Sequence, residues 1–147
     1  MEELKMFDVV YIDNTINKQG SEQDGVRPAI IIQNNMGNKH SPTVLIMCLT
    51  TSIKKNYLPT HCIIHNTKEN GLKKKSMLLG ETLTQISKER ILSKVGTISD
   101  SEVQNDILNV YLANITGRKK YNSVFSKILN KIFKLVKEGY EEDGNAA

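Results

Sequence analysis

What this chain of 147 residues lacks excludes several classes of protein. It has no tryptophan, only two cysteines and only three histidines. Cys48 and Cys62 lie inside apolar, strand-like runs, where a thiol behaves as a small hydrophobic side chain. We therefore expect neither a disulfide nor a cysteine-based metal site, and we predict that the protein needs no cofactor.

Long apolar stretches are absent as well, and no run of residues has the length that crossing a bilayer requires. Residues 1–5 form neither a basic leader nor the start of an apolar region. We therefore expect no membrane association and a location in the cytoplasm, where the chain is made. The net charge of +4 fits a nucleic-acid-binding protein and fits equally an ordinary surface with a modest basic excess.

The order of apolar patterns predicts strands first and helices last. Strand-like runs occupy residues 8–13, 29–33, 43–50, 60–65 and 76–79. The runs at 29–33 and 43–50 are continuously apolar, which is typical of strands buried on both faces. Polar, turn-rich segments at 14–25 and 34–42 predict two loops. Short strands joined by turns favour a closed or half-closed barrel.

Helical signals begin only after the predicted strands. Ser87 is placed to cap a single turn over the next three residues. A longer helix is predicted to begin near Ser99 or Ser101 and to end at Gly117. Residues 121–139 have apolar side chains on one side of a helix and lysines on the other, which predicts a second, amphipathic helix.

The length of the chain suits one ordinary domain with a short appendage. We assign residues 1–117 to that domain, 118–140 to the additional C-terminal helix and 141–147 to a polar, disordered tail. The apolar side of the additional helix is too large to remain in water. We expect it to pack on the domain or across a dimer.

The most specific motif lies at the end of the first polar loop. Residues 20–28 read Gly-Ser-Glu-Gln-Asp-Gly-Val-Arg-Pro and resemble the Gly-Ser-Glu-Gln-x-Gly-x-Arg-Pro signature of the MazF/PemK family of toxin ribonucleases. Shorter matches follow in the same order at 32–35, 41–43 and 58–61. The resemblance covers residues 5–116 and implies a mainly β fold with C-terminal helices, an SH3-like small barrel of the MazF/PemK (CcdB-like) type.

The same resemblance implies a function. Members of this family are toxins of type II toxin–antitoxin systems, normally homodimers, that cut single-stranded RNA at short sequences without a metal. Cleavage of mRNA inhibits translation and growth, and a cognate MazE-like antitoxin silences the toxin. The expected products carry 2′,3′-cyclic phosphate and 5′-hydroxyl ends.

RNA cleavage without a metal has three chemical requirements. The 2′-hydroxyl must lose a proton, the charge developing on the phosphate must be stabilised, and the leaving 5′-oxygen must gain a proton. Arg27 presents a planar, permanently charged fork suited to stabilising phosphate oxygens. Thr50 falls where the family has its catalytic Thr or Ser, and Glu22 is the carboxylate that can take the 2′-hydroxyl proton.

The predicted RNA contacts lie in the signature loop and near strand ends. They are Ser21, Gln23, Asn34, Thr51, Glu81 and Thr82. Without the motif, plainer interpretations stay open: Arg27 in a surface ion pair and Thr50 as an ordinary strand residue. His61 and His65 would share one face of a strand and form an alternative acid–base pair, although we favour structural roles for both.

Three positions depart from the family pattern, and two other functions fit the same barrel. Phe7 stands where members usually have Gly, Gly80 where a large aliphatic residue is common, and Thr82 where many have Gln. The alternatives are a CcdB-like toxin that binds a topoisomerase and a catalytically silent regulator that binds RNA or an antitoxin. The CcdB-like family lacks the signature and ends in a Trp-containing helix, whereas this chain has no Trp. The presence of Arg27 and Thr50 argues against the silent regulator.

Overall fold

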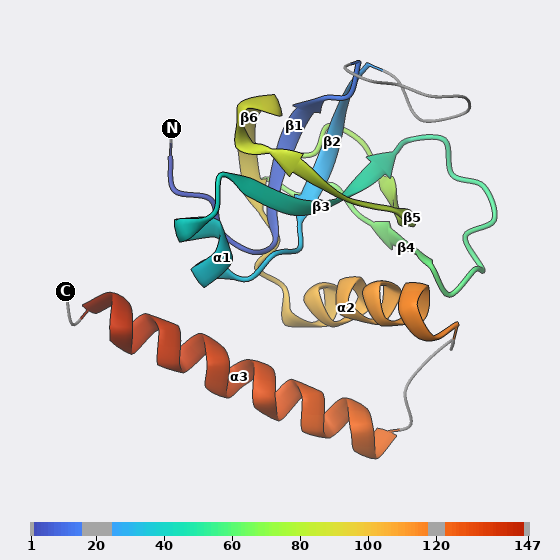
Figure 1. Cartoon of the computed structure of the whole chain (residues 1–147). Helices are drawn as coiled ribbons and strands as arrows, with labels where there is room; N and C mark the ends of the chain where they lie inside the picture. Colours follow the sequence, from blue (N-terminus) through green and yellow to red (C-terminus); the bar gives the residue numbers. More distant parts are fainter. Residues whose placement is uncertain (1, 16–24, 118–122, 146–147) are drawn as a thin grey trace.

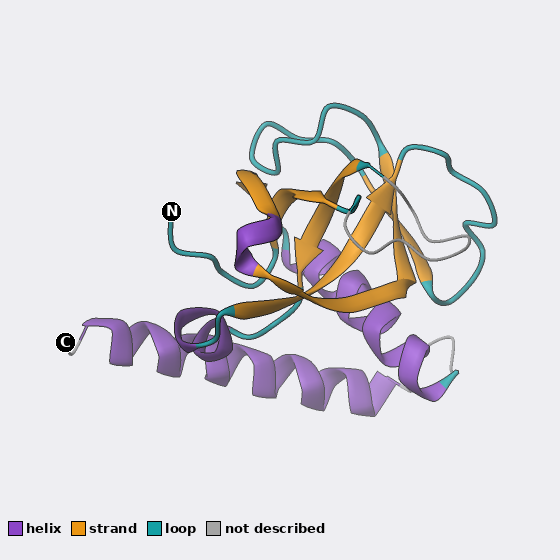
Figure 2. Cartoon of the chain, turned by 45° about the horizontal axis from the view of Figure 1, so that its top comes forward, coloured by secondary structure: helices purple, strands orange, loops and turns teal. Residues whose placement is uncertain are grey.

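The computed structural model describes residues 2–15, 25–117 and 123–145, and within them the chain forms one six-stranded sheet with its longer helices on one side (Figures 1 and 2). The strands are β1 (Asp8–Asp13), β2 (Val26–Ile31), β3 (Thr43–Thr50), β4 (His61–Ile64), β5 (Ser76–Ser87) and β6 (Ile91–Thr97). The helices are α1 (Asn35–His40), the short 3-10 turn η1 (Lys88–Arg90), α2 (Ser101–Thr116) and α3 (Ser123–Asn145). The fold is mainly β with C-terminal helices, as predicted.

All neighbouring strands are antiparallel, in the order β4-β5-β3-β2-β1-β6. The structure contains two elements that the sequence-based prediction did not include. Residues 91–97 form a strand that the prediction missed, because Ile91 is its only fully buried residue and its partner β1 lies far upstream. The loop expected at 34–42 contains helix α1, whose first turn is capped by the Asn34 side chain accepting from Gly37 N at 2.9 Å.

The continuously apolar runs are buried on both faces, as predicted. Alternate residues of β1, β2 and β3 enter two separate clusters. Val9, Ile30 and Met47 belong to the cluster that packs against α2. Their neighbours in sequence, including Val10 and Cys48, belong to the second cluster, together with Ile86 and Ile91. The sheet therefore curves around the second cluster, and helix α2 covers the first cluster.

Strand β5 pairs with both β3 and β4 because it bends at a bulge. Its register with β3 shifts between Ile46↔Thr84 and Cys48↔Leu79. The Thr82 hydroxyl holds this irregularity together by accepting from Cys48 N at 2.7 Å and donating to Leu79 O at 2.6 Å. Beyond the bulge, the first residues of β5 also pair with β4. The predicted strand at 76–79 is therefore longer than expected, since the bulge interrupts its apolar pattern.

Helix α2 agrees with its predicted limits. Asp100 caps its start by accepting from Glu102 N at 2.8 Å, and Gly117 ends it in the left-handed conformation, with φ of 68°. The helix packs close to β5 at Gly80, where a Cβ would lie 2.8 Å from Val110 Cγ1 and from Thr60 O. The departure from the family at Gly80 thus permits the close approach of α2.

Helix α3 extends beyond the predicted helix and continues through Asn145, so residues 141–145 are helical where we expected the disordered tail to begin. Phe133 packs against the core cluster covered by α2, and Lys137 Nζ donates to Gln104 Oε1 at 2.8 Å. Ile132 and Leu135 remain 49% and 62% exposed. The expected packing of the apolar face on the domain is therefore found for only part of that face. In the described part of the chain, no helix has the length and apolar character needed to cross a membrane.

The departure at Phe7 is also coupled to α3. Phe7 has a positive φ of 71°, which explains why Gly is usual there: a non-Gly residue loses roughly 1–2 kcal/mol in this conformation. Phe7 N donates to Ile31 O at 2.8 Å, and the ring is buried in the core. Lys137 of α3 lies 5.8 Å from the ring centroid, which is a cation–π contact. The ring therefore links the domain to the additional helix.

Candidate active site

The strand register brings the two principal catalytic candidates to one place. β2 pairs with β3 through Ala29↔Cys48, Ile30↔Met47 and Ile31↔Ile46. Continuing this register by two residues on each strand puts Arg27 opposite Thr50. Residues directly opposite in an antiparallel pair have side chains on the same face, with Cβ atoms about 4.5–5.5 Å apart. Both residues are half-buried, at the end of the sheet where β2 begins and β3 ends.

A second arginine lies at this end of the sheet. Burial raises the pKa of the Cys48 thiol, while a hydrogen bond with Thr82 and the positive charges of Arg27 and Arg90 oppose that rise. Both guanidinium groups therefore act on the same sulfur. Arg90 Nε donates to Asp13 O at 3.0 Å and Nη2 donates to Asn14 Oδ1 at 2.8 Å. Arg90 was not among the predicted site residues, because no local pattern marks a contact between residues 76 positions apart.

The signature loop begins and ends beside Arg27. The last β1–β2 pair is Asp13↔Val26, and Asn14 N donates to Gly25 O at 3.1 Å. Thr15 donates to Asp13 Oδ1 from its hydroxyl at 2.5 Å and from its backbone at 2.9 Å, and these bonds lower the pKa of Asp13. Ser21, Glu22 and Gln23 lie outside the described residues. Their loop is anchored at both ends next to the Arg27 strand.

The remaining predicted RNA contacts fall in different environments. Thr51 is exposed directly after Thr50. Asn34 caps α1, and the Thr82 hydroxyl is used inside the β5 bulge. Glu81 is exposed and accepts a 2.7 Å bond with His61. The structure thus brings Thr51 close to the candidate pair along the chain and gives internal partners to Asn34, Glu81 and Thr82.

The alternative histidine pair is not formed on one strand. β4 ends at Ile64, and His65 is exposed beyond it. His61 Nε2 lies 2.7 Å from Glu81 Oε1, and His61 Nδ1 lies 3.0 Å from Lys55 O. Both ring nitrogens of His61 therefore contact protein groups, which favours a structural role for this residue over an acid–base role.

The cysteines behave as apolar residues, and both thiols are free. Burial, followed by the negative charge of Asp106, raises the pKa of the Cys62 thiol to about 12. Across the described ranges, no three His, Cys, Asp or Glu side chains are grouped as ligands for a metal ion.

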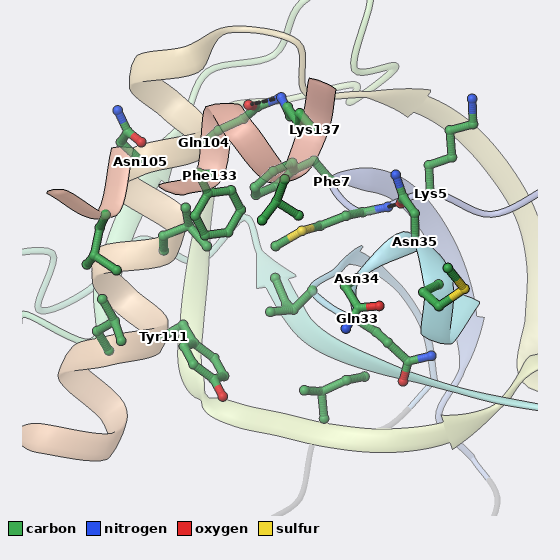
Figure 3. A pocket seen from close by; sticks show the side chains of 18 of the residues that line it. Lys5, Phe7, Gln33, Asn34, Asn35, Gln104, Asn105, Tyr111, Phe133 and Lys137 are labelled. Atoms are coloured by element: carbon green, nitrogen blue, oxygen red, sulfur yellow. Dashed lines mark hydrogen bonds between the residues drawn. The ribbon is translucent and has the colours of Figure 1, made fainter. Parts of the chain in front are cut away.

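A groove of about 1080 Å³ lies elsewhere, between the N-terminal segment, α1, α2 and α3 (Figure 3). Phe7, Tyr111 and Phe133 line it together with amide side chains, including those of Asn34 and Gln33. Neither Arg27 nor Thr50 belongs to its lining, and no arginine does within the described part. The cations that line the groove include Lys5, Lys39 and Lys137, whose ammonium groups cannot bind two phosphate oxygens as a planar guanidinium does. We therefore assign the candidate active site to the Arg27–Thr50 end of the sheet and not to this groove.

Comparisons with known proteins show which family the chain resembles. The family model of PemK-like, MazF-like toxins of type II toxin–antitoxin systems matches residues 5–120. The chain is 39% identical over 111 residues to the endoribonuclease MazF of Staphylococcus saprophyticus, which covers 74% of this chain and 92% of that protein. The residues matched by the family model include the strands that carry Arg27 and Thr50.

Solved structures of lower sequence identity share the fold. MazF from Deinococcus radiodurans has a TM-score of 0.63 at 14% identity, covering 80% of this chain and all of that one. A mycobacterial endoribonuclease in complex with its cognate antitoxin has a TM-score of 0.58 at 18% identity, covering 78% and 95% of the two chains. The family match spans most of the chain and includes the signature, the sheet and α2. The chain therefore belongs to the family of PemK-like, MazF-like toxins of type II toxin–antitoxin systems.

Proposed function

We propose that this toxin is a sequence-specific endoribonuclease that cuts single-stranded RNA without a metal ion, leaving 2′,3′-cyclic phosphate and 5′-hydroxyl ends. Endoribonuclease activity is the one named for the staphylococcal relative. The observation that supports the proposal is the β2–β3 pairing at Ala29↔Cys48, because continuing its register by two residues on each strand brings Arg27 opposite Thr50. Cutting mRNA in the cytoplasm would inhibit translation and growth.

The chemistry divides among three residues. The Arg27 guanidinium binds two non-bridging phosphate oxygens and stabilises their developing charge. Glu22, on the loop anchored beside Arg27, accepts the 2′-hydroxyl proton as the 2′-oxygen bonds to phosphorus. As the bond from phosphorus to the 5′-oxygen breaks, that oxygen takes a proton from solvent water.

Thr50 is placed to assist the departure of the 5′-oxygen. Its hydroxyl oxygen accepts from Ser52 N at 3.2 Å, which leaves the hydroxyl proton for donation to the phosphate or the leaving oxygen. A β-branched side chain at the end of a paired strand has few rotamers, so this geometry is held in place. We assign Ser21, Gln23 and Thr51 to contacts with RNA around the reacting phosphate, and we retain Asn34, Glu81 and Thr82 as RNA-contact candidates that also have structural partners.

The partners of the toxin follow the same reasoning. A mycobacterial protein of this fold is in complex with its cognate antitoxin. We propose a MazE-like antitoxin for this chain and a homodimeric toxin. Co-purification with a co-expressed antitoxin and the mass of the toxin in solution test these two assignments.

One experiment tests the catalytic proposal. The purified chain is incubated with a long single-stranded RNA in EDTA, and the cut ends are mapped and their termini identified. We expect cleavage at a recurrent short sequence with cyclic phosphate and 5′-hydroxyl termini. Products with 5′-phosphate, or loss of cleavage on chelation that added metal restores, contradict the mechanism. An absence of cutting in all conditions supports the silent regulator instead.

A further inference from the structure

The loop that follows Thr50 has an unusual surface. Residues 51–60 join β3 to β4 and swing away from the sheet (Figure 1). Lys54 and Lys55 are exposed, and the ring of Tyr57, two residues further on, is 70% exposed. Two cations and an aromatic ring are therefore presented to solvent by the segment that leaves the candidate catalytic residue.

This loop is held in one conformation by its own hydrogen bonds. Lys55 has a positive φ of 49°, which a non-Gly residue adopts only where surrounding contacts compensate. Leu58 N donates to Lys55 O at 3.2 Å, and His61 N donates to Leu58 O at 3.0 Å. These bonds close two successive turns around Tyr57, so the ring projects from a defined backbone.

A side-chain clamp fixes the same loop to the sheet. The His61 side chain is 7% exposed and bridges Lys55 O, at 3.0 Å from Nδ1, and Glu81 Oε1, at 2.7 Å from Nε2. Glu81 belongs to β5, the strand that pairs with both Thr50 and His61. The clamp therefore ties the loop to the strand that also supports the candidate active site.

We propose that residues 54–57 form a base-stacking subsite for single-stranded RNA. The ring of Tyr57 stacks on an unpaired base near the cleaved phosphate, and Lys54 and Lys55 bind the neighbouring phosphates. Exposed aromatic rings beside cations are the usual means of binding single strands, because every base has a π face and every nucleotide has a charge. His61 and Glu81 are positioning residues that hold the ring. The inference rests on the proposed ribonuclease function and names a further part of its RNA site.

The immediate surroundings of Tyr57 favour RNA over a protein partner. A single exposed aromatic residue is common on protein surfaces and has no meaning alone. The three residues before it, Lys54, Lys55 and Asn56, are exposed and polar, and the apolar residues after it, Leu58 and Pro59, are half-buried. A protein hot spot needs apolar neighbours that exclude water, whereas stacking on a base needs only an accessible ring and nearby positive charge.

Binding measurements on the full chain test the subsite. All variants carry Arg27→Ala to prevent cleavage, and fluorescence anisotropy follows a labelled single-stranded RNA containing the mapped cut sequence. We expect Tyr57→Ala to weaken binding about 5- to 150-fold, as loss of one stacked base does. Tyr57→Phe keeps the ring and should bind like its parent. Leu92→Ala, at another exposed apolar residue (56% exposed), is the matched control and should have no effect.

Abasic nucleotides distinguish stacking from a general electrostatic contact. An abasic substitution scanned along the RNA should weaken binding to the Arg27→Ala parent at one flanking position, and Tyr57→Ala should remove the sensitivity at that position. Lys54→Ala should instead lower affinity for all sequences and reduce the slope of log affinity against log salt by about 1. Equal abasic profiles for the parent and Tyr57→Ala overturn the subsite.

A double-mutant cycle tests the clamp. Glu81→Ala should weaken RNA binding through the loss of ring position, so its effect should nearly disappear when Tyr57 is already Ala. Fully additive effects contradict the positioning role. In the Arg27-containing enzyme, Tyr57→Ala should raise KM with little change in kcat. If that enzyme cuts RNA but Tyr57→Ala has no effect on KM, the subsite alone is wrong. If the enzyme neither cuts nor binds RNA, the ribonuclease proposal itself fails.

Discussion

The curved sheet and helix α3 are stabilised in different ways. In the sheet, both faces of β1, β2 and β3 are buried, so each of these strands contributes side chains to two cores. Helix α3 rests on the rest of the molecule through Phe133, Lys137 and their neighbours, while much of its apolar surface stays exposed. Catalysis and most of the stability should therefore depend on the sheet, whereas α3 should add some stability and not be needed for catalysis.

The largest effect should come from a core truncation in the sheet. Ile30 is fully buried, and Ile30→Ala should lower the free energy of unfolding by about 2–5 kcal/mol. Ile132 of α3 is 49% exposed, so the same change there should cost well under half as much. Urea unfolding of the two variants measures the difference directly. Equal losses would show that α3 is as much a part of the core as β2.

Arg27 tests whether catalysis belongs to the sheet. Arg27→Ala should reduce RNA cleavage by a factor of about 10² to 10³ because a fixed charge stabiliser is lost, while the fold remains intact. Arg27→Lys should restore little, since an ammonium group cannot bind two oxygens as a planar fork does. Lys134→Ala on α3 is the control and should cut like the parent. Cleavage rates and circular dichroism are measured together, and full activity in Arg27→Ala would remove this residue from the site.

Removal of α3 tests the separation of the two regions. A chain that ends at Gly117 should melt at a lower temperature or be less soluble, because the groove lined by Phe7 and Leu108 would lose its α3 wall. The sequence of its cut sites should be unchanged, since Arg27 and Thr50 lie on the sheet. Unchanged stability together with lower RNA affinity and a shallower salt dependence would identify the lysine side of α3 as an RNA-binding surface.

Phe7 contacts both regions, and its substitution changes two energies: the free energy of burying its ring and the strain of its positive φ. Phe7→Ala loses a buried ring, at about 3–5 kcal/mol, and keeps the unfavourable positive φ. Phe7→Gly loses the same ring but relieves roughly 1–2 kcal/mol of backbone strain. We therefore expect both variants to be less stable than the parent and the Gly variant to be the more stable of the two. Thermal unfolding of the pair decides this, and an Ala variant at least as stable as the Gly variant would contradict the strain argument.

The smallest effect concerns pH. The pKa of the Cys62 thiol rises from an ordinary value of 9.0 to about 12 on folding, mainly through burial. Its contribution to stability is therefore complete below pH 9 and is lost as pH rises towards 12, because the unfolded thiol ionises first. Urea midpoints from about pH 8 to about pH 11 should fall more steeply for the parent than for Cys62→Ala. Parallel curves would mean that this thiol is not buried in solution.

Local patterns predicted much of the fold, and long-range contacts account for most of the errors. β1, β3, η1 and α2 were predicted because their apolar runs and caps lie within the segments themselves. β6 was missed because it depends on β1, and α1 because Asn34 and its neighbours resemble a turn when their capping bonds are not seen. The length of β5 was underestimated because the bulge breaks its apolar pattern.

In the candidate site too, the sequence marked individual residues but not the long-range contacts between them. The signature motif identified Arg27, and the resemblance identified Thr50. Continuing the β2–β3 register brings them opposite each other, and that they act together stays a prediction. The links from Arg90 to Asn14 and from His61 to Glu81 join residues 76 and 20 positions apart, and no pattern in the sequence marks either link. Contacts of this kind become visible only when the strand order is known.

The pairing of β1 with β6 also sets the order in which the toxin can be built during synthesis. β1, β2 and β3 are consecutive neighbours, so the segments carrying Arg27 and Thr50 can pair as soon as they leave the ribosome. The second edge of β1 is covered only after residue 97 has been made, because Thr97 of β6 pairs with Asp8 of β1. At translation rates of about 5–20 residues per second this interval is on the order of seconds. We expect the segments that carry Arg27 and Thr50 to be paired during that time while the other edge of β1 is still uncovered.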